Sequence, residues 1–109
     1  MKIWLDDKRP APEGWTWVQT PYAACYFMEQ GDVEEISLDH DLGLYLVDGT
    51  EMTGNDVVIA IERAAYEGVW SYVPKTIRIH SANAGIYKKM EQAIESIERM
   101  RNASEPILR

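Results

Sequence analysis

The chain has 109 residues, of which 46% are hydrophobic and 27% charged, and this composition excludes intrinsic disorder, collagen and small disulfide-rich scaffolds. Its 18 acidic and 11 basic residues leave a net charge of −7, which disfavours binding along duplex DNA. Cys25 is the one cysteine, and no apolar run reaches the roughly 20 residues of a membrane span. We therefore predict one cytoplasmic domain over residues 1–109 with no membrane partner.

The first third of the chain predicts two short strands and a helix. Met1–Leu5 is an apolar run typical of a buried strand, and Trp15–Val18 is a second candidate. Two prolines and a glycine within Lys8–Gly14 predict a loop between them. Thr20 is a suitable N-cap for a helix over Pro21–Gly31, which begins with proline and ends with glycine.

The middle of the chain predicts a strand, a hairpin and a second helix. Glu35–Leu38 has the composition of a buried strand. In the segment Leu42–Met52, an Asp48-Gly49 pair between apolar residues is typical of a hairpin turn. The segment Thr53–Asp56 has the pattern of a helix capping box, and Gly68 is a suitable helix end.

The last third predicts one more strand and one more helix. Lys75–Ile79 is the strand, and apolar residues recur at helical spacing after it. Strands that alternate with helices indicate a mostly parallel sheet of about four strands covered by helices. The apolar positions of the last helix are Ile86, Met90, Ala93, Ile94, Ile97 and Met100.

Polar residues follow three of the predicted strands. Because parallel strands end at one edge of a sheet, these side chains are expected to converge at the edge where open α/β sheets bind ligands. They are Asp6 and Asp7, then Asp39, His40 and Asp41, then His80, Ser81 and Asn83.

This cluster predicts metal-assisted phosphate chemistry. Several neighbouring carboxylates ionise together only when a cation neutralises them, and hard oxygen ligands suit Mg²⁺, Mn²⁺ or Ca²⁺. A histidine beside such a metal can act as a general acid or base near neutral pH. Ser81 and Asn83 can donate hydrogen bonds to a phosphate oxygen, or cap the last helix, and the two roles are compatible.

Structural interpretations compete with the functional one at several positions. Asp6 and Asp7 are also suited to capping a loop, and His40 to bonding the backbone. Asp48 and Asp56 are expected in a turn and a cap rather than at a metal. Of the aromatic residues, Trp15 and Trp17 follow the first loop and are expected in the core, with stacking on a base as the alternative.

Three motifs, WLDDKRPAPEGW, ISLDHDLG and IRIHSAN, resemble the cyclic-phosphate processing receiver-like domain, a relative of the receiver domains of two-component signalling. The resemblance extends from Lys2 to about Arg101. It implies a receiver-like (flavodoxin-like) fold, a three-layer α/β sandwich. It also implies a Mg²⁺ or Mn²⁺ site at the paired acids and the acid ending the central strand, and a cyclic phosphate on a nucleotide or RNA end as partner.

The chain departs from signalling receivers, because it has no room for the fifth strand that carries their essential lysine. We therefore expect a metal-dependent phosphoesterase. The metal ligands would be Asp6, Asp7 and Asp39, with Asp41 as a further ligand or an orienting group. Asp39 also belongs to the catalytic set, beside His40 or His80 as acid or base. Lys8, Arg9, Ser81 and Asn83 would hold the phosphate. The alternatives are a module that sequesters a cyclic nucleotide and a degenerate receiver that acts through protein contacts.

Overall fold

The computed structural model describes residues 1–68, 73–80 and 88–104, so predictions at Ser81, Asn83 and Ile86 lie outside the described residues. None of the helices in this part of the chain has the length and apolar character needed to cross a bilayer. The elements are β1 Lys2–Leu5, β2 Thr16–Val18, α1 Pro21–Glu29, β3 Glu35–Leu38, β4 Asp41–Tyr45, β5 Glu51–Thr53, α2 Gly54–Glu67, β6 Thr76–Ile79 and α3 Lys88–Ser104.

Four of the strands form a parallel sheet in the order β2-β1-β3-β6. Leu5 of β1 lies opposite Val18 of β2 and Leu38 of β3, and Leu38 lies opposite Ile79 of β6. All four strands therefore end at the same edge, and the predicted α/β fold with a parallel four-stranded sheet is confirmed.

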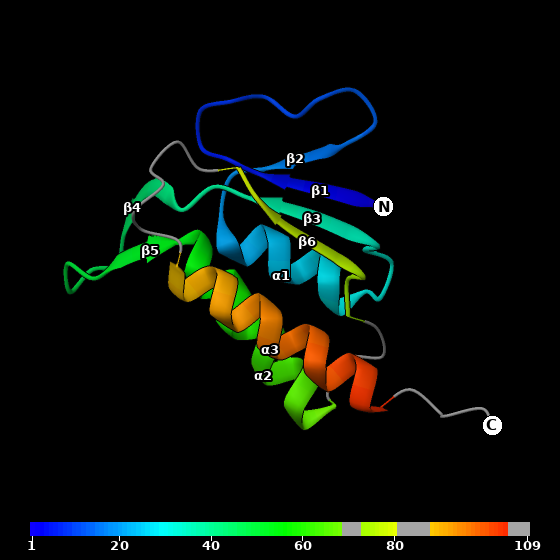
Figure 1. Ribbon diagram of the computed structural model, residues 1–109. Helices are drawn as coiled ribbons and strands as arrows, with labels where there is room; N and C mark the ends of the chain where they lie inside the picture. Colours follow the sequence, from blue (N-terminus) through cyan, green and yellow to red (C-terminus); the bar gives the residue numbers. More distant parts are fainter. Residues whose placement is uncertain (69–72, 81–87, 105–109) are drawn as a thin grey trace.

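The three helices cover one face of this sheet. The connections through α1, from β2 to β3, and through α2, from β3 to β6, run in the same direction across the sheet. Because such crossovers are right-handed, α1 and α2 lie on the same face, where they contact each other and α3 packs on α2. In Figure 1 the helices lie below the sheet, and the helix-free connection from β1 to β2 arches above it. The described elements thus form two layers, which differs from the expected third layer of helices.

Alternation along the strands separates the two faces of the sheet. Ile3 and Leu5 of β1 are fully buried, as are Ile36 and Leu38 of β3, and they share one core with apolar residues of all three helices. The opposite face has an aromatic and polar row across the four strands. This row consists of Trp17, Trp4, Ser37 and Arg78.

Local signals determine where α1 and α2 begin and where α2 ends, as predicted, whereas α1 ends at Glu29, two residues before the predicted Gly31. The Thr20 hydroxyl accepts a hydrogen bond from the Ala23 amide at 3.1 Å and caps α1. Thr53 and Asp56 form the capping box at the start of α2, and Gly68 ends that helix in the left-handed region, with φ of 67°.

The hairpin of β4 and β5 connects the end of β3 to the start of α2. Its turn has Gly49 at φ 88°, and the Asp48 carboxylate accepts a hydrogen bond from the Thr50 amide at 2.9 Å. The first residue of α2, Gly54, packs directly on the residue that follows β3, since a Cβ there would lie 2.1 Å from the carbonyl oxygen of Asp39. This contact places the start of α2 against the edge where the polar residues gather.

Candidate metal and phosphate site

Backbone pairing continues one residue beyond three of the strands. The amide of Asp6 donates to the carbonyl of Val18, that of Asp39 to Leu5, and that of His80 to Leu38, at 3.1, 2.9 and 2.9 Å. Asp6, Asp39 and His80 therefore form a row at the carboxyl edge of the sheet, although His80 is 74 positions from Asp6 in the sequence.

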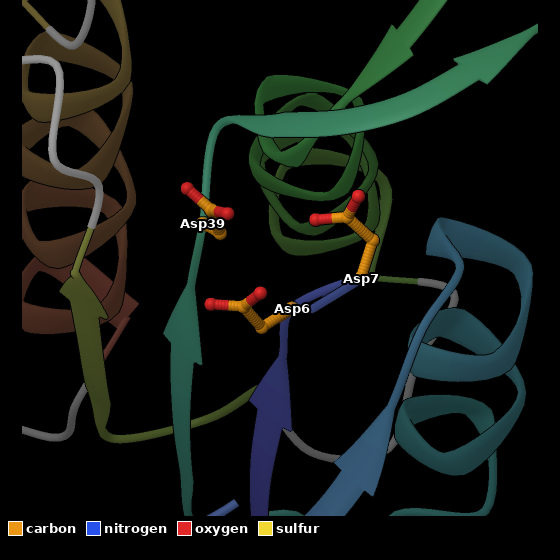
Figure 2. Close-up of side chains that lie close together, drawn as sticks. All are labelled: Asp6, Asp7 and Asp39. Atoms are coloured by element: carbon orange, nitrogen blue, oxygen red, sulfur yellow. The ribbon is translucent and has the colours of Figure 1, made fainter. Parts of the chain in front are cut away.

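Three carboxylates lie together at this edge. Asp6, Asp7 and Asp39 each offer an oxygen, and these oxygens all lie within 4.8 Å of one another. Figure 2 shows the three side chains around a common space beyond the tips of β1 and β3. Asp6 and Asp39 are buried, with 1% and 7% of their surface exposed, and Asp7 is half-buried. Hard oxygen donors in this number suit a divalent cation such as Mg²⁺, so these residues fit the expected metal.

Both oxygens of Asp6 already accept hydrogen bonds. Oδ1 accepts from the backbone amides of Lys8 and Arg9, each at 2.9 Å, and Oδ2 accepts from Nε of Arg9 at 2.9 Å and Nε2 of His80 at 3.1 Å. Burial acts to raise the pKa of Asp6, but these donors together outweigh it and lower the pKa. Burial and the neighbouring Asp6 charge instead raise the pKa of Asp39. The pKa values of Asp6 and Asp39 are therefore shifted in opposite directions in the metal-free protein.

Arg9 supplies a positive charge at this cluster. Beyond its bond to Asp6, its Nη2 donates to the carbonyl of His80 at 3.0 Å and lies 3.7 Å from Oδ1 of Asp39. Half of the Arg9 side chain stays exposed, and Lys8 beside it is exposed too. Arg9, which was expected to hold phosphate, thus serves in this structure as an internal counter-ion of Asp6 and Asp39.

Three contacts fix the position of the His80 ring. Its ring stacks on Trp4 with centroids 3.7 Å apart and an angle of 6° between the planes, and its Nδ1 lies 2.7 Å from the hydroxyl of Ser37. Burial lowers the pKa of His80, although Asp6 acts in the opposite direction. A neutral ring that donates from Nε2 to Asp6 and accepts at Nδ1 from Ser37 satisfies every contact. Sequence reasoning missed Ser37, for which the available signal was a polar residue inside an apolar strand.

His40 and Asp41 form a second pair. Nδ1 of His40 lies 2.8 Å from Oδ1 of Asp41, with 14% of the histidine side chain and 53% of the aspartate side chain exposed. Among the described residues, Asp41 is not part of the group of three carboxylates. Through this contact Asp41 can fix the orientation of the His40 ring. Asp48 and Asp56 lie in the predicted turn and cap.

The tryptophans near the site differ in burial. Trp15 is half-buried and meets the edge of Trp4, with ring centroids 6.0 Å apart. Trp17 is 42% exposed, so the expectation that it packs in the core is wrong. The reason is the two-layer arrangement, in which none of the described helices covers the face that carries Trp17.

A comparison with known families agrees with this site, an acidic cluster at the carboxyl edge of a parallel sheet. The family model described as Cyclic-phosphate processing Receiver domain matches residues 1–96. The chain belongs to this family. No curated protein and no solved structure matches the chain. The membership confirms the receiver-like fold that the three motifs implied, and it links the chain to the processing of cyclic phosphates.

Proposed function

We propose that this protein is a divalent-metal-dependent phosphoesterase that opens a cyclic phosphate on a nucleotide or RNA end. The observation that carries the proposal is the group of Asp6, Asp7 and Asp39, whose oxygens lie within 4.8 Å of one another at the ligand-binding edge of the sheet. Family membership supports the substrate class. The lone Cys25 supports a reducing, cytoplasmic location, and residues 1–109 would act as one domain.

Asp6, Asp7 and Asp39 would hold Mg²⁺ or Mn²⁺, with their carboxylate oxygens as ligands. Such an ion polarises a phosphoryl oxygen and lowers the pKa of bound water. The protein places these three oxygens beforehand through the strand ends and the backbone donors to Asp6. Arg9 and Lys8 lie beside the group and would neutralise the phosphate of the substrate.

His40 is the better candidate for proton transfer. Its Nδ1 donates to Asp41, because a carboxylate only accepts, so Nε2 is left as the nitrogen that takes up or gives a proton. No partner of that nitrogen is found among the described residues. His80 has both nitrogens engaged, by Asp6 and Ser37, which favours a positioning role toward the metal ligand Asp6.

The proposal is tested by incubating the protein with a panel of cyclic phosphates and reading the products by mass. The panel holds 2′,3′-cyclic mononucleotides, 3′,5′-cyclic nucleotides, cyclic dinucleotides and RNA with a 2′,3′-cyclic end, each with Mn²⁺, with Mg²⁺ and with EDTA. We expect one class to be opened only with metal, and the Asp39→Asn variant to be inactive while still folded. If every ligand is recovered unchanged and one stays bound, the protein is a binding module instead.

A further inference from the structure

Trp17 lies at the boundary between the acidic cluster and the face of the sheet that none of the described helices covers. It lies on the edge strand β2, in register with Trp4 and two residues before the row that contains Asp6. Its indole Nε1 donates to the backbone carbonyl of Asp6 at 2.7 Å. The ring therefore extends along the sheet toward the edge where the carboxylates lie.

The contacts of the indole leave its apolar surface available. Its polar N–H group is satisfied by Asp6, and 42% of the residue is exposed. The neighbouring aromatic residues are used within the fold, because Trp4 stacks on His80 and meets the edge of Trp15. Among the three tryptophans that the structure describes, Trp17 is exposed and the other two are half-buried. An anchored, exposed ring of this kind is a rigid stacking surface with little conformational entropy to lose on binding.

From this position we infer that Trp17 binds the base of a cyclic nucleotide by stacking, so that the substrates of the site are nucleotides rather than cyclic phosphates without a base. The inference rests on the proposed function, since it takes the phosphate to bind beside Asp6, Asp7 and Asp39. Asp6 connects the ring and the cluster, because its backbone carbonyl accepts from the indole and its carboxylate belongs to the cluster. Stacking accepts any of the four bases, because every base has a π-face.

A second role of Trp17 must be separated from stacking, namely its support of the Asp6 backbone. The variants Trp17→Phe and Trp17→Ala both lose the N–H bond to the Asp6 carbonyl, but only the first keeps a ring. The two are compared on 2′,3′-cyclic AMP and on glycerol 1,2-cyclic phosphate, which has the same five-membered phosphate ring and no base. The matched control is Tyr66→Ala, which removes an exposed aromatic residue at the end of α2 remote from the cluster.

We expect kcat/KM of Trp17→Ala on 2′,3′-cyclic AMP to be about tenfold or more below that of Trp17→Phe, mainly through KM. On the glycerol compound the two variants should agree within about twofold, because the reacting groups are the same. Tyr66→Ala should behave as the wild type on both compounds. Equal losses in Trp17→Phe and Trp17→Ala on the nucleotide would overturn the inference and leave Trp17 a structural residue.

Binding without turnover gives an independent readout. Calorimetric titration with adenosine 2′-monophosphate and with inorganic phosphate, both with Mg²⁺, should show a nucleotide preference in the wild type and in Trp17→Phe that Trp17→Ala loses. Metal-dependent opening of both cyclic compounds with no such preference overturns the stacking alone. A wild type that opens neither compound but keeps the ring-dependent preference overturns the esterase alone. Binding of neither ligand overturns both.

Discussion

At the scale of single residues, Arg9 provides the cationic charge that the acidic cluster has before a metal binds. Its guanidinium bonds Asp6 and lies near Asp39, while burial raises the free-energy cost of leaving these carboxylates unpaired. A divalent cation that took Oδ2 of Asp6 as a ligand would compete with the two donors that hold this oxygen, Arg9 and His80. Under the proposed function Arg9 and the metal would therefore compete, and a displaced guanidinium would stay next to the phosphate of the substrate.

This competition predicts opposite effects of one substitution on two quantities. Arg9→Gln should bind Mn²⁺ about tenfold more tightly than the wild type, which corresponds to about 1.4 kcal/mol, and should open the cyclic substrate more slowly because a phosphate ligand is lost. Calorimetric titration with Mn²⁺ and steady-state kinetics measure the two quantities. Lys8→Gln is the control for the metal titration alone, since it removes an adjacent exposed charge whose side chain has no bond to the cluster among the described residues. Weaker metal binding in Arg9→Gln would contradict the competition.

The two histidines predict different kinetic defects. His40→Gln should lower kcat by about 100-fold or more, the usual contribution of a general acid or base, and leave Mn²⁺ affinity close to that of the wild type. His80→Gln should mainly weaken Mn²⁺ binding, by about tenfold, because it loosens the ligand Asp6. Kinetics at saturating metal and metal titrations separate the two. A kcat loss in His80→Gln that saturating Mn²⁺ does not restore would assign proton transfer to His80.

Burial and the Asp6 charge raise the pKa of Asp39, which predicts a pH dependence of the metal-free protein. A carboxyl whose pKa is higher in the folded than in the unfolded state stabilises the fold at low pH, and this stabilisation is lost as the pH rises from the unfolded pKa through the folded one. In EDTA at neutral pH, Asp39→Asn should therefore be more stable than the wild type, by about 1 kcal/mol. The advantage should shrink as the pH falls toward 4, near the unfolded pKa.

Denaturant titrations of both proteins across pH measure this difference. Asp32→Asn is the control, because Asp32 is exposed and outside the cluster. An Asp39→Asn variant that is less stable than the wild type at neutral pH would show that Asp39 is already neutralised by Arg9.

The residues of the cluster could be predicted from the sequence, but most of their contacts could not. Asp6 and Asp39 directly follow apolar runs, so a parallel sheet requires that they meet. The bonds from His80 and Arg9 to Asp6 depend on side-chain directions across different elements, which no local pattern encodes. The side chain of Asp41 turns to His40, because Asp41 already belongs to the first strand of the hairpin.

At the scale of elements, the start of α2 packs against the end of β3, beside the acidic cluster. Gly54 is the first residue of the helix, its amide donates to the carbonyl of His40 at 3.0 Å, and its Cα faces the carbonyl of Asp39. No side chain fits between this helix and the end of β3. Glycine is needed here for close approach, whereas its conformational freedom is needed at Gly49 and Gly68, where φ is positive.

We therefore predict that Gly54→Ala disturbs the metal site. Its Cβ would lie 2.1 Å from the oxygen of Asp39, so the backbone of Asp39 must shift, at a cost of about 3 kcal/mol or more in unfolding free energy and about tenfold in Mn²⁺ affinity. Gly14→Ala is the comparison, because φ of 87° strains it by about 1–2 kcal/mol but nothing lies within 4 Å of its Cβ. Its metal affinity should stay unchanged. Wild-type affinity in Gly54→Ala would show that the contact is not needed.

The elements were predictable where a local signal marks them. The capping box of Thr53 and Asp56, the Asp48-Gly49 turn and the Thr20 cap all act within a few residues, and the structure contains each of them. The face on which each helix lies depends on strand order, which is a long-range property. A three-layer arrangement needs connections in both directions, and here the reverse step, from β1 to β2, contains no helix.

At the scale of the whole molecule, the net charge of −7 and the buried carboxylates both contribute negative charge around the site. Both make the metal-free state electrostatically costly and favour the uptake of cations. The face of the sheet that none of the described helices covers, with Trp17 and Arg78 exposed, adjoins the same edge, where the proposed stacking would place a nucleotide. The proposed esterase activity, metal requirement and base stacking would thus all depend on one end of the sheet.

The most direct test of the metal-dependent esterase compares metal occupancy with rate. The opening of the preferred cyclic phosphate is followed in water enriched in ¹⁸O while Mn²⁺ is titrated, and occupancy is measured by calorimetry under the same conditions. We expect one ¹⁸O atom per product and a rate that rises with occupancy to the same midpoint, with both lost in Asp39→Asn. A rate that is unchanged in EDTA, or no opening of any cyclic phosphate at full occupancy, would contradict the proposed function.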